Sequence, residues 1–289
     1  MDKQGMQLMP TTWRCGRFLF NFHQRKRPLV MGILNTTPDS FSDGGKFRTA
    51  KDALAQAELM ITNGVDLIDI GGESTRPGAE PVSLQEELDR VLPVIEGLKD
   101  CGVPLSIDTY KAETMRQALR TGVDCVNDIW ALRQEGAIDA VLEHANCGMV
   151  LMHMQRDPLT MQFNPEYQDV IAEVKQFLQE RAELLQANGV ERNRIAIDPG
   201  FGFGKSLEHN LHMLSQFQAF STLGYPVLAG ISRKSMIGKI TGKDANDRVA
   251  PSIAAAITAA DRGANIIRVH DVAETVDALK LWEAINTQT

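Results

Sequence analysis

The stretch Ile195-Ala-Ile-Asp-Pro-Gly-Phe-Gly-Phe-Gly-Lys205 has the form of a buried β-strand that ends in a carboxylate and continues into a glycine-rich turn. Short and almost wholly apolar runs of this kind are typical of parallel strands that are covered on both faces. Seven runs along the chain end in polar residues that could take part in chemistry: Leu29–Asn35, Leu67–Arg76, Pro104–Asp108, Cys125–Asp128, Ile195–Asp198, Pro226–Lys234 and Ile266–His270. Because the strand ends of a parallel α/β barrel open on one face, these groups are predicted to converge on one pocket.

Eight strands alternate with eight helices in this interpretation. The predicted strands are residues 29–34, 67–70, 104–107, 125–127, 149–154, 195–197, 226–231 and 266–269. Helical periodicity predicts helices at residues 49–63, 83–99, 111–120, 137–145, 165–187, 206–220, 246–262 and 271–285, the second opening on a capping box of Ser83 and Glu86. This order predicts an α/β chain with a single (β/α)8 TIM barrel over residues 29–289. A doubly wound sheet is the alternative, but it needs a glycine-rich turn where Asn35–Pro38 stands.

The residues before the first strand, 1–28, are predicted to form an extension of the barrel. Apolar and polar residues alternate from Thr12 to Phe22 around Gly16, which predicts a β-hairpin. Such a hairpin could close the N-terminal mouth of the barrel, which is a structural role.

The overall composition disfavours several classes of function. The chain carries 30 Lys and Arg against 37 Asp and Glu, and its net charge of −7 disfavours a general binder of nucleic acid or acidic membranes. Residues 1–10 are too polar for a signal peptide, and no run approaches the roughly 18 apolar residues of a membrane span. The four cysteines, Cys15, Cys101, Cys125 and Cys147, show no zinc or Cys-x-x-Cys spacing. We therefore expect reduced thiols and a cytoplasmic protein.

The glycine-rich turn after Asp198 suggests two nucleotide-binding motifs and matches neither. A Walker A motif needs glycine where Pro199 stands, and the dinucleotide fingerprint needs its third glycine where Lys205 stands. What remains is a strand-end carboxylate followed by glycines that permit close approach to a flat ligand. The alternative is a tight connection in which Asp198 caps a helix.

Two further loops combine polar groups with glycine and proline. Asn35-Thr-Thr-Pro-Asp-Ser-Phe-Ser-Asp-Gly-Gly45 follows the first strand and suits a lid over a polar ligand, with a plain connection as the alternative. Gly71-Gly-Glu-Ser-Thr-Arg-Pro-Gly78 follows the second strand. Its Arg76 could bind phosphate or carboxylate in bidentate fashion, unless it is simply solvated.

Basic residues follow the last two strands, where barrels of this kind often bind phosphate. They lie in Ser232-Arg-Lys-Ser235 and Arg268-Val-His270, and a merely solvated face is the alternative. His153 lacks a second histidine at ligand spacing, so we expect it to form a strand-end hydrogen bond rather than bind a metal. His209 and His212 are expected on the surface of a helix.

Four of these strand-end groups would form a slot for a flat, nitrogen-rich heterocycle beside the basic site. Asp198 and Asn127 could read an amino-pyrimidine edge, Asp108 could accept hydrogen bonds from ring N–H groups, and Lys234 could donate to a ring carbonyl or nitrogen.

The loop sequences quoted above, together with Arg268-Val-His-Asp271, closely resemble the dihydropteroate synthases, pterin-binding enzymes of folate biosynthesis that sulfonamides inhibit. The resemblance runs from about Leu29 to the C-terminus, and every motif occurs in the family order. It implies a transferase that condenses 6-hydroxymethyl-7,8-dihydropterin diphosphate with p-aminobenzoate to 7,8-dihydropteroate and diphosphate. It also implies sulfonamides as competitive inhibitors and a homodimer built on the late helices, for which residues 246–262 offer a candidate face, unless their apolar stripe packs on the barrel.

The resemblance also assigns a role to individual residues. The pterin ring would contact Asp108, Asn127, Met152, Asp198, Phe203, Lys234 and Arg268. The diphosphate would contact Asn35, Thr75, Arg268 and His270, with Asn35 as the ligand of a diphosphate-bound Mg²⁺. p-Aminobenzoate would contact Phe41, Thr75, Arg76, Pro77, Lys234 and Ser235. The catalytic residues would be Asp43, Asp108, Lys234, Arg268 and His270.

The substrate itself suggests the reaction course. The electron-rich dihydropterin can expel diphosphate from its exocyclic CH₂ while cations stabilise the leaving group, and Asp43 and Asp108 can stabilise the resulting pterin cation. The aryl amine then attacks without a covalent enzyme intermediate. Two alternatives are a pterin-dependent methyltransferase and a pterin-binding paralogue without activity. The elements Arg268-Val-His270 and Ser232-Arg-Lys-Ser235, which the methyltransferase does not need, argue against the first, and the presence of Asp43 and His270 argues against the second.

Overall fold

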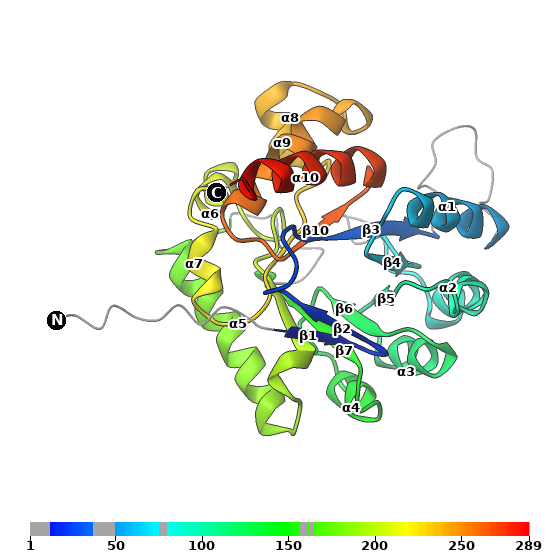
Figure 1. Cartoon of the computed structure of the whole chain (residues 1–289). Coiled ribbons are helices and arrows are strands. Elements are labelled where there is room, and N and C mark those ends of the chain that lie inside the picture. Colours follow the sequence, from blue (N-terminus) through cyan, green and yellow to red (C-terminus); the bar gives the residue numbers. More distant parts are fainter. Residues whose placement is uncertain (1–11, 37–49, 75–79, 157–160, 162–164, 289) are drawn as a thin grey trace.

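Parallel strands form a nearly closed barrel with helices around it (Figure 1). The computed structural model describes residues 12–36, 50–74, 80–156, 161 and 165–288. The barrel strands are β3 (Leu29–Asn35), β4 (Leu67–Gly71), β5 (Leu105–Asp108), β6 (Cys125–Asp128), β7 (Gly148–Met152), β8 (Ile195–Asp198), β9 (Leu228–Ala229) and β10 (Ile266–Val269). Their order in the sheet is β8-β7-β6-β5-β4-β3-β10-β9, and an isolated parallel bridge between Ile197 and Val227 links the region of β8 to that of β9. The predicted (β/α)8 barrel is confirmed.

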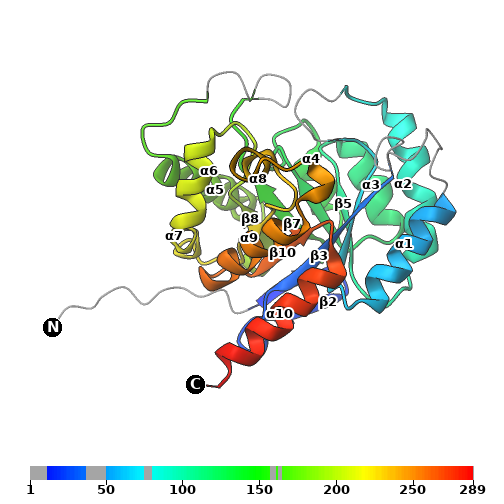
Figure 2. The same ribbon diagram turned by 90° about the horizontal axis from the view of Figure 1, so that it is seen from above.

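Helices cover the outside of the barrel (Figure 2). They are α1 (Ala50–Thr62), α2 (Leu84–Leu98), α3 (Ala112–Thr121), α4 (Ala137–Leu142), α5 (Val170–Ala187), α6 (Leu207–Ser215), α7 (Gln218–Ser221), α8 (Ser235–Thr241), α9 (Val249–Asp261) and α10 (Val272–Asn286). Among the helices described, none has the combination of length and apolarity that crossing a membrane requires.

Three local predictions about the helices need correction. The predicted helix 206–220 is divided into α6 and α7, and the buried ring of Phe217 stacks on Phe201 at the division. Helix α8 was not predicted, because its seven residues are too few to show a clear period. At the start of α2, Ser83 accepts a hydrogen bond from the backbone N–H of Glu86, but the Glu86 carboxylate pairs with Arg90 instead of completing a capping box.

The predicted hairpin is present and packs against the N-terminal end of the barrel. It consists of β1 (Thr12–Cys15) and β2 (Phe18–Asn21), paired antiparallel. Trp13 and Cys15 are fully buried against inward residues of the barrel strands, including Leu29 and Leu67. Gly16 turns the hairpin with a φ of +57°, and a Cβ there would lie 2.3 Å from Oδ1 of Asp124, so only glycine fits.

The strands change character along their length. Inward positions near their N-terminal ends are apolar, as with Leu67 and Cys125, and join the cluster around Trp13. The next inward positions on the same strands are polar, namely Asp69 and Asn127. The intervening outward residues join a large apolar cluster between the sheet and the helices. A polar interior therefore begins halfway up the barrel.

Candidate active site

An arginine on β10 joins two carboxylates on neighbouring strands. Nε of Arg268 donates to Oδ2 of Asp69 over 2.6 Å, and its Nη2 donates to Oδ2 of Asp108 over 2.7 Å. The amide Nδ2 of Asn127 also donates to Oδ2 of Asp69, over 2.9 Å. The structure thus brings together Asp108, Asn127 and Arg268, which the sequence predicted to share one site.

The carboxylates of this network are not fully satisfied. Within the described part of the chain, Oδ1 of Asp69 and Oδ1 of Asp108 are buried without a hydrogen-bond partner. Burial raises the pKa of Asp108 from its ordinary value to about 7, although the positive charge of Arg268 opposes this. Unpaired buried acceptors beside a guanidinium are suited to accept hydrogen bonds from a ligand.

The polar side chains of this site form a ring, the strand-end ring, with Asp69, Asp108, Asn127 and Arg268 in one half. Its second half, Asp198 and Lys234, lies at the end of β8 and between β9 and α8. Oδ1 of Asp198 accepts a hydrogen bond from the backbone N–H of Gly200 over 2.7 Å. The alternative that Asp198 caps the following helix is wrong, because Ser206 caps α6. A Cβ on Gly230 would lie 3.8 Å from Oδ2 of Asp198 and 4.0 Å from Cβ of Arg268, so the two halves of the ring are adjacent.

Lys234 lies between this carboxylate and an aromatic wall. Its ammonium lies 4.1 Å from the centroid of the Phe203 ring and donates to the backbone carbonyl of Phe201. Burial lowers the pKa of Lys234 to about 8, while Asp198 opposes this, and burial raises the pKa of Asp198 while Lys234 opposes that. The two groups thus favour each other's charged forms in a poorly solvated place.

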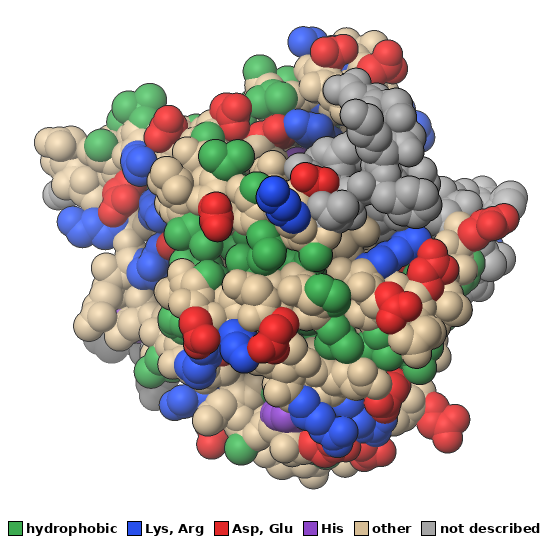
Figure 3. Space-filling model, turned by 90° about the vertical axis from the view of Figure 1, so that its right-hand side faces the viewer, with side chains coloured by type: hydrophobic (Ala, Val, Ile, Leu, Met, Phe, Trp, Pro, Cys, Tyr) green, Lys and Arg blue, Asp and Glu red, His purple; other side chains and the backbone are tan. Residues whose placement is uncertain are grey.

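Apolar side chains line the same end of the barrel. Met152 at the end of β7 packs with Ile129, Met154 and Met161, and Phe203 joins this cluster. Figure 3 shows a different face, the flank that carries α1 and α2 at the right of Figure 1, where hydrophobic side chains lie between charged ones. An apolar wall beside a ring of polar groups suits a flat heterocycle.

The two basic segments, residues 232–235 and 268–270, contact each other through Ser232 and His270. Oγ of Ser232 lies 3.0 Å from Nδ1 of His270 and accepts a hydrogen bond from the backbone N–H of His270 over 3.2 Å. Arg233 instead forms an ion pair with Asp271, so it serves the structure around α8 and is not a free cation. Ser235 is exposed at the first position of α8.

Asn35 lies at the end of β3, where Gly71 of β4 leaves room beside it. A Cβ on Gly71 would lie 3.4 Å from Oδ1 of Asn35 and 3.8 Å from Cβ of Asp108. Among the described residues, no group of three or more His, Cys, Asp or Glu side chains could hold a metal ion. An amide oxygen at a strand end nevertheless suits a Mg²⁺ that arrives with a phosphate ligand, because Mg²⁺ commonly takes few protein ligands at such sites.

Several predicted residues cannot be placed. Phe41, Asp43, Thr75, Arg76 and Pro77 lie outside the described residues, so the roles of the first two loops stay predictions.

The histidines are structural in different ways. Nδ1 of His153 lies 2.9 Å from the ammonium of Lys205, as expected of a strand-end hydrogen bond. Burial, with the charge of Lys205 second, lowers the pKa of His153, so the ring is neutral. His212 is exposed as predicted, but His209 is half-buried and completes a capping box with Ser206.

Lys205 is buried among acceptors and holds the glycine-rich turn. Its ammonium donates to the backbone carbonyls of Gly200 and Phe203, each over 2.9 Å, and to that of His153 over 3.3 Å. Lys205 thereby ties the loop after β8 to the end of β7, and that loop carries Phe203.

Sequence reasoning missed Asp69, which lies inside β4 rather than after it. It is completely buried and contacts two of the predicted site residues. The available signal was a carboxylate in the otherwise apolar run Leu67-Ile-Asp-Ile-Gly71, because an acid is seldom buried without a partner.

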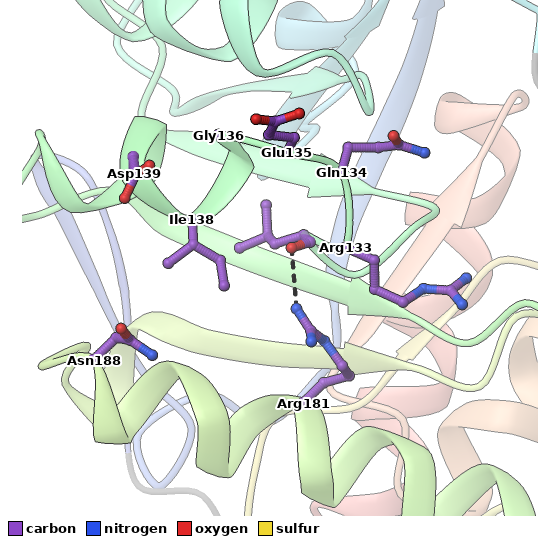
Figure 4. Close-up of a pocket in the computed structure, with 9 residues that line it drawn as sticks. Arg133, Gln134, Glu135, Gly136, Ile138, Asp139, Arg181 and Asn188 are labelled. Carbon is purple, nitrogen blue, oxygen red and sulfur yellow. Dashed lines mark hydrogen bonds between the residues drawn. The ribbon is translucent and has the colours of Figure 1, made fainter.

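A separate cavity of about 460 Å³ lies between the segment that leads into α4 and helix α5 (Figure 4). It is lined by Leu132, Arg133, Gln134, Glu135, Gly136, Ile138, Asp139, Arg181 and Asn188. Arg181 donates to the carbonyl of Leu132 over 3.0 Å. None of the predicted site residues lines this cavity.

Comparison with known proteins agrees with this geometry. The family model described as pterin binding enzyme matches residues 31–270. The chain is 49% identical to the dihydropteroate synthase of Neisseria meningitidis serogroup C, over 94% of this chain and 97% of the relative. It is 47% identical to that of Escherichia coli K12, over 89% and 91%.

Solved structures of relatives have the same fold. The dihydropteroate synthase of Burkholderia cenocepacia, complexed with 7,8-dihydropteroate, is 51% identical with a TM-score of 0.88, and 97% of this chain and 98% of that one are covered. That of Yersinia pestis, in complex with a sulfonamide drug, is 44% identical with a TM-score of 0.90, covering 96% and 99%. The chain therefore belongs to the pterin-binding enzymes and, among them, to the dihydropteroate synthases.

Proposed function

We propose that the strand-end ring is the site at which this chain joins p-aminobenzoate to 6-hydroxymethyl-7,8-dihydropterin diphosphate, giving 7,8-dihydropteroate and diphosphate. The observation that carries the proposal is the convergence of Asp108, Asn127 and Arg268 with Asp198 and Lys234 at one end of the barrel. Relatives of the same family are described in complex with 7,8-dihydropteroate and with 4-aminobenzoic acid.

The pterin would occupy the slot between the polar ring and the apolar wall. Acceptor oxygens of Asp198 and Asp108 would receive the ring's N–H groups, and Lys234 would donate to its carbonyl or ring nitrogen. Met152 and Phe203 would cover one side. Since Oδ1 of Asp108 has no partner among the described residues, a ligand N–H there would gain a hydrogen bond without breaking one.

Departure of the diphosphate would be assisted by cationic and polar groups on the β10 side. Arg268, together with His270 beside Ser232, would stabilise the negative charge that develops as the C–O bond breaks. Asn35 would hold a Mg²⁺ carried by the diphosphate, and this ion would supply further charge neutralisation.

The substitution would be dissociative. The bonding pair leaves with the diphosphate oxygen, and the exocyclic carbon becomes part of a planar pterin cation that Asp108, and by prediction Asp43, would stabilise. The neutral amine of p-aminobenzoate then forms the new C–N bond and releases a proton. In this scheme no cysteine or serine becomes acylated or alkylated, and Thr75, Arg76, Pro77, Phe41 and Ser235 would hold p-aminobenzoate.

The deciding experiment measures diphosphate release by the purified chain. Release should require both p-aminobenzoate and Mg²⁺, and sulfonamides should inhibit it in competition with p-aminobenzoate. Binding of the pterin substrate without any diphosphate release would indicate an inactive pterin-binding protein and would contradict the proposal.

We also propose a cytoplasmic homodimer. All four cysteines are free thiols, which suits a reducing compartment. Four alanines of α9 are buried on the barrel, while Ile253 and Ile257 of the same helix are half-buried, and Leu281 and Ile285 on α10 and Ile240 on α8 are exposed. These apolar side chains of α8, α9 and α10 are candidates for the dimer face. Light scattering should give twice 31.9 kDa, and a monomer at micromolar concentration would rule the dimer out.

A further inference from the structure

We propose that Asp69 is a positioning residue of the pterin slot, whose carboxylate fixes the amide orientation of Asn127 and the direction of the Arg268 guanidinium. This inference rests on the proposed function of the ring. Asp69 lies in the middle of β4, faces the barrel interior and is completely buried. It therefore acts on a ligand only through the side chains that it holds.

The contact with Asn127 settles which way the amide faces. An ionised carboxylate only accepts hydrogen bonds, so the amide must turn its NH₂ group toward Oδ2 of Asp69, 2.9 Å away. The amide oxygen of Asn127 then points away from Asp69. If the amide were reversed, two acceptor oxygens would face each other in a buried place. Asp69 thus makes Asn127 present its amide oxygen to the slot, and this oxygen prefers a ligand N–H group.

The contact with Arg268 fixes a second group through the same oxygen. Oδ2 of Asp69 also accepts from Nε of Arg268 over 2.6 Å, while Asp108 accepts from Nη2 over 2.7 Å. Two carboxylates that take two different nitrogens of one planar guanidinium define the plane of that group. Loss of Asp69 would leave Arg268 held by Asp108 alone and free to swing about that bond.

A purely structural role explains the position of Asp69 less well. Its Oδ1 is buried and has no hydrogen-bond partner in the described part of the chain. Asp124, an equally buried carboxylate at the other end of the barrel, accepts four hydrogen bonds from Arg17 and Leu105, shared between both oxygens. A half-satisfied carboxylate costs stability, as is common where groups are arranged for a ligand.

The test compares Asp69→Ala and Asp69→Asn with Asp124→Asn as the matched control. Steady-state kinetics would be measured with 6-hydroxymethyl-7,8-dihydropterin diphosphate and p-aminobenzoate, and thermal unfolding would be followed in parallel. Asp69→Ala should raise the KM for the pterin substrate by about tenfold or more and lower kcat, with the KM for p-aminobenzoate changed less than about threefold. Asp69→Asn keeps an acceptor oxygen and should recover part of the loss. Asp124→Asn should lower the Tm and leave the pterin KM unchanged.

A double-mutant cycle with Asn127→Ala separates positioning from general destabilisation. If Asp69 acts through Asn127, the Asp69→Ala change should raise the pterin KM clearly less in the Asn127→Ala background than in the wild type. If Asp69→Ala does not fold, the cycle is run with Asp69→Asn. A pterin KM within about threefold of wild type in Asp69→Ala would overturn the inference. So would a cycle in which Asp69→Ala raises the pterin KM by the same factor in the Asn127→Ala background as in the wild type. A wild-type chain that releases no diphosphate would instead refute the proposed function.

Discussion

Acids at the N-terminal end of the barrel and acids that face its interior near the C-terminal end are paired differently. At the N-terminal end, Asp124 accepts four hydrogen bonds, and Asp66 accepts from Arg25, from Arg27 and from the backbone N–H of Val30. At the C-terminal end, Asp69 and Asp108 each keep one oxygen without a partner within the described residues. The acids that precede β4 and β6 are thus satisfied, whereas the acids that lie on β4 and β5 each keep an unpaired oxygen.

This difference separates stability from binding. Satisfied charges and the buried Trp13 of the hairpin close the N-terminal end of the barrel, whereas barrels of this kind bind ligands at the C-terminal end. Unsatisfied acceptors cost free energy in the empty protein and recover it when a ligand supplies the missing donors. The comparison predicts that changes at the N-terminal end alter unfolding, whereas changes at the C-terminal end alter substrate use.

The largest expected effect is a loss of stability on removing Trp13 of the N-terminal hairpin. Trp13→Ala removes a fully buried indole that packs on Phe20 and donates to the carbonyl of Arg194. It should lower the free energy of unfolding by about 3–5 kcal/mol, as measured by denaturant titration. The pterin KM of the folded fraction should stay at the wild-type value, and a large change in it would break the separation of the two ends.

Lys205→Met should cost nearly as much stability, although Lys205 lies at the C-terminal end. The change leaves the carbonyls of Gly200 and Phe203 without their buried donor, and we expect a loss of about 3 kcal/mol. Because the turn carries Phe203, the pterin KM should rise as well. Thermal unfolding and steady-state kinetics of the same variant would show whether Lys205 supports both stability and pterin binding. An unchanged Tm would show that the glycine-rich turn keeps its conformation without Lys205.

Asp198→Ala should act mainly on binding, with a smaller loss of stability because the backbone N–H of Gly200 loses its acceptor. It removes the acceptor beside Lys234 and leaves the donors of the pterin unpaired in a buried slot, a loss on the order of 2–3 kcal/mol or more. Calorimetric titration with the pterin substrate should therefore detect no binding at micromolar concentrations. Near-normal affinity would remove Asp198 from the site.

Asp108→Asn should stabilise the ligand-free protein at neutral pH. The pKa of Asp108 is raised to about 7 by burial, so the folded state holds its proton up to about pH 7, whereas the unfolded state loses it near 3.8. Between these values the unfolded state binds fewer protons, and stability falls as pH rises.

The neutral amide should remove this penalty, with a gain on the order of 1–2 kcal/mol at pH 8 and none at pH 4. Thermal unfolding at both pH values would test this, and diphosphate release should fall in the same variant. Asp128, whose pKa burial also raises to about 7, contributes a slope of the same sign, so the pH dependence should lessen but not vanish. A lower Tm at pH 8 would show instead that the Arg268 pair dominates.

The sequence predicted the ends of β5 and β8 well, because Asp108 and Asp198 are polar residues that stop an apolar run. The strands predicted at 149–154 and 226–231 are shorter in the structure, as β7 ends at Met152 and β9 at Ala229. The sequence missed Asp69 because that residue lies inside a run, where its partner Arg268 is 199 residues away. It also could not show which cation of the basic segment 232–235 is engaged elsewhere, and the structure pairs Arg233 with Asp271. Pairing between distant residues is invisible to local pattern.

By itself, the sequence determined the alternation of strands and helices, and with it the barrel and the end at which its polar groups gather. Periodicity and strand-end chemistry are local properties, so they can be read from neighbouring residues. Only the tertiary structure decided which polar groups are paired and which are left for a ligand. Asp69, Asp124 and Asp198 are the same residue type within or directly before similar strands, and their different roles come from the partners that the closed barrel brings to each.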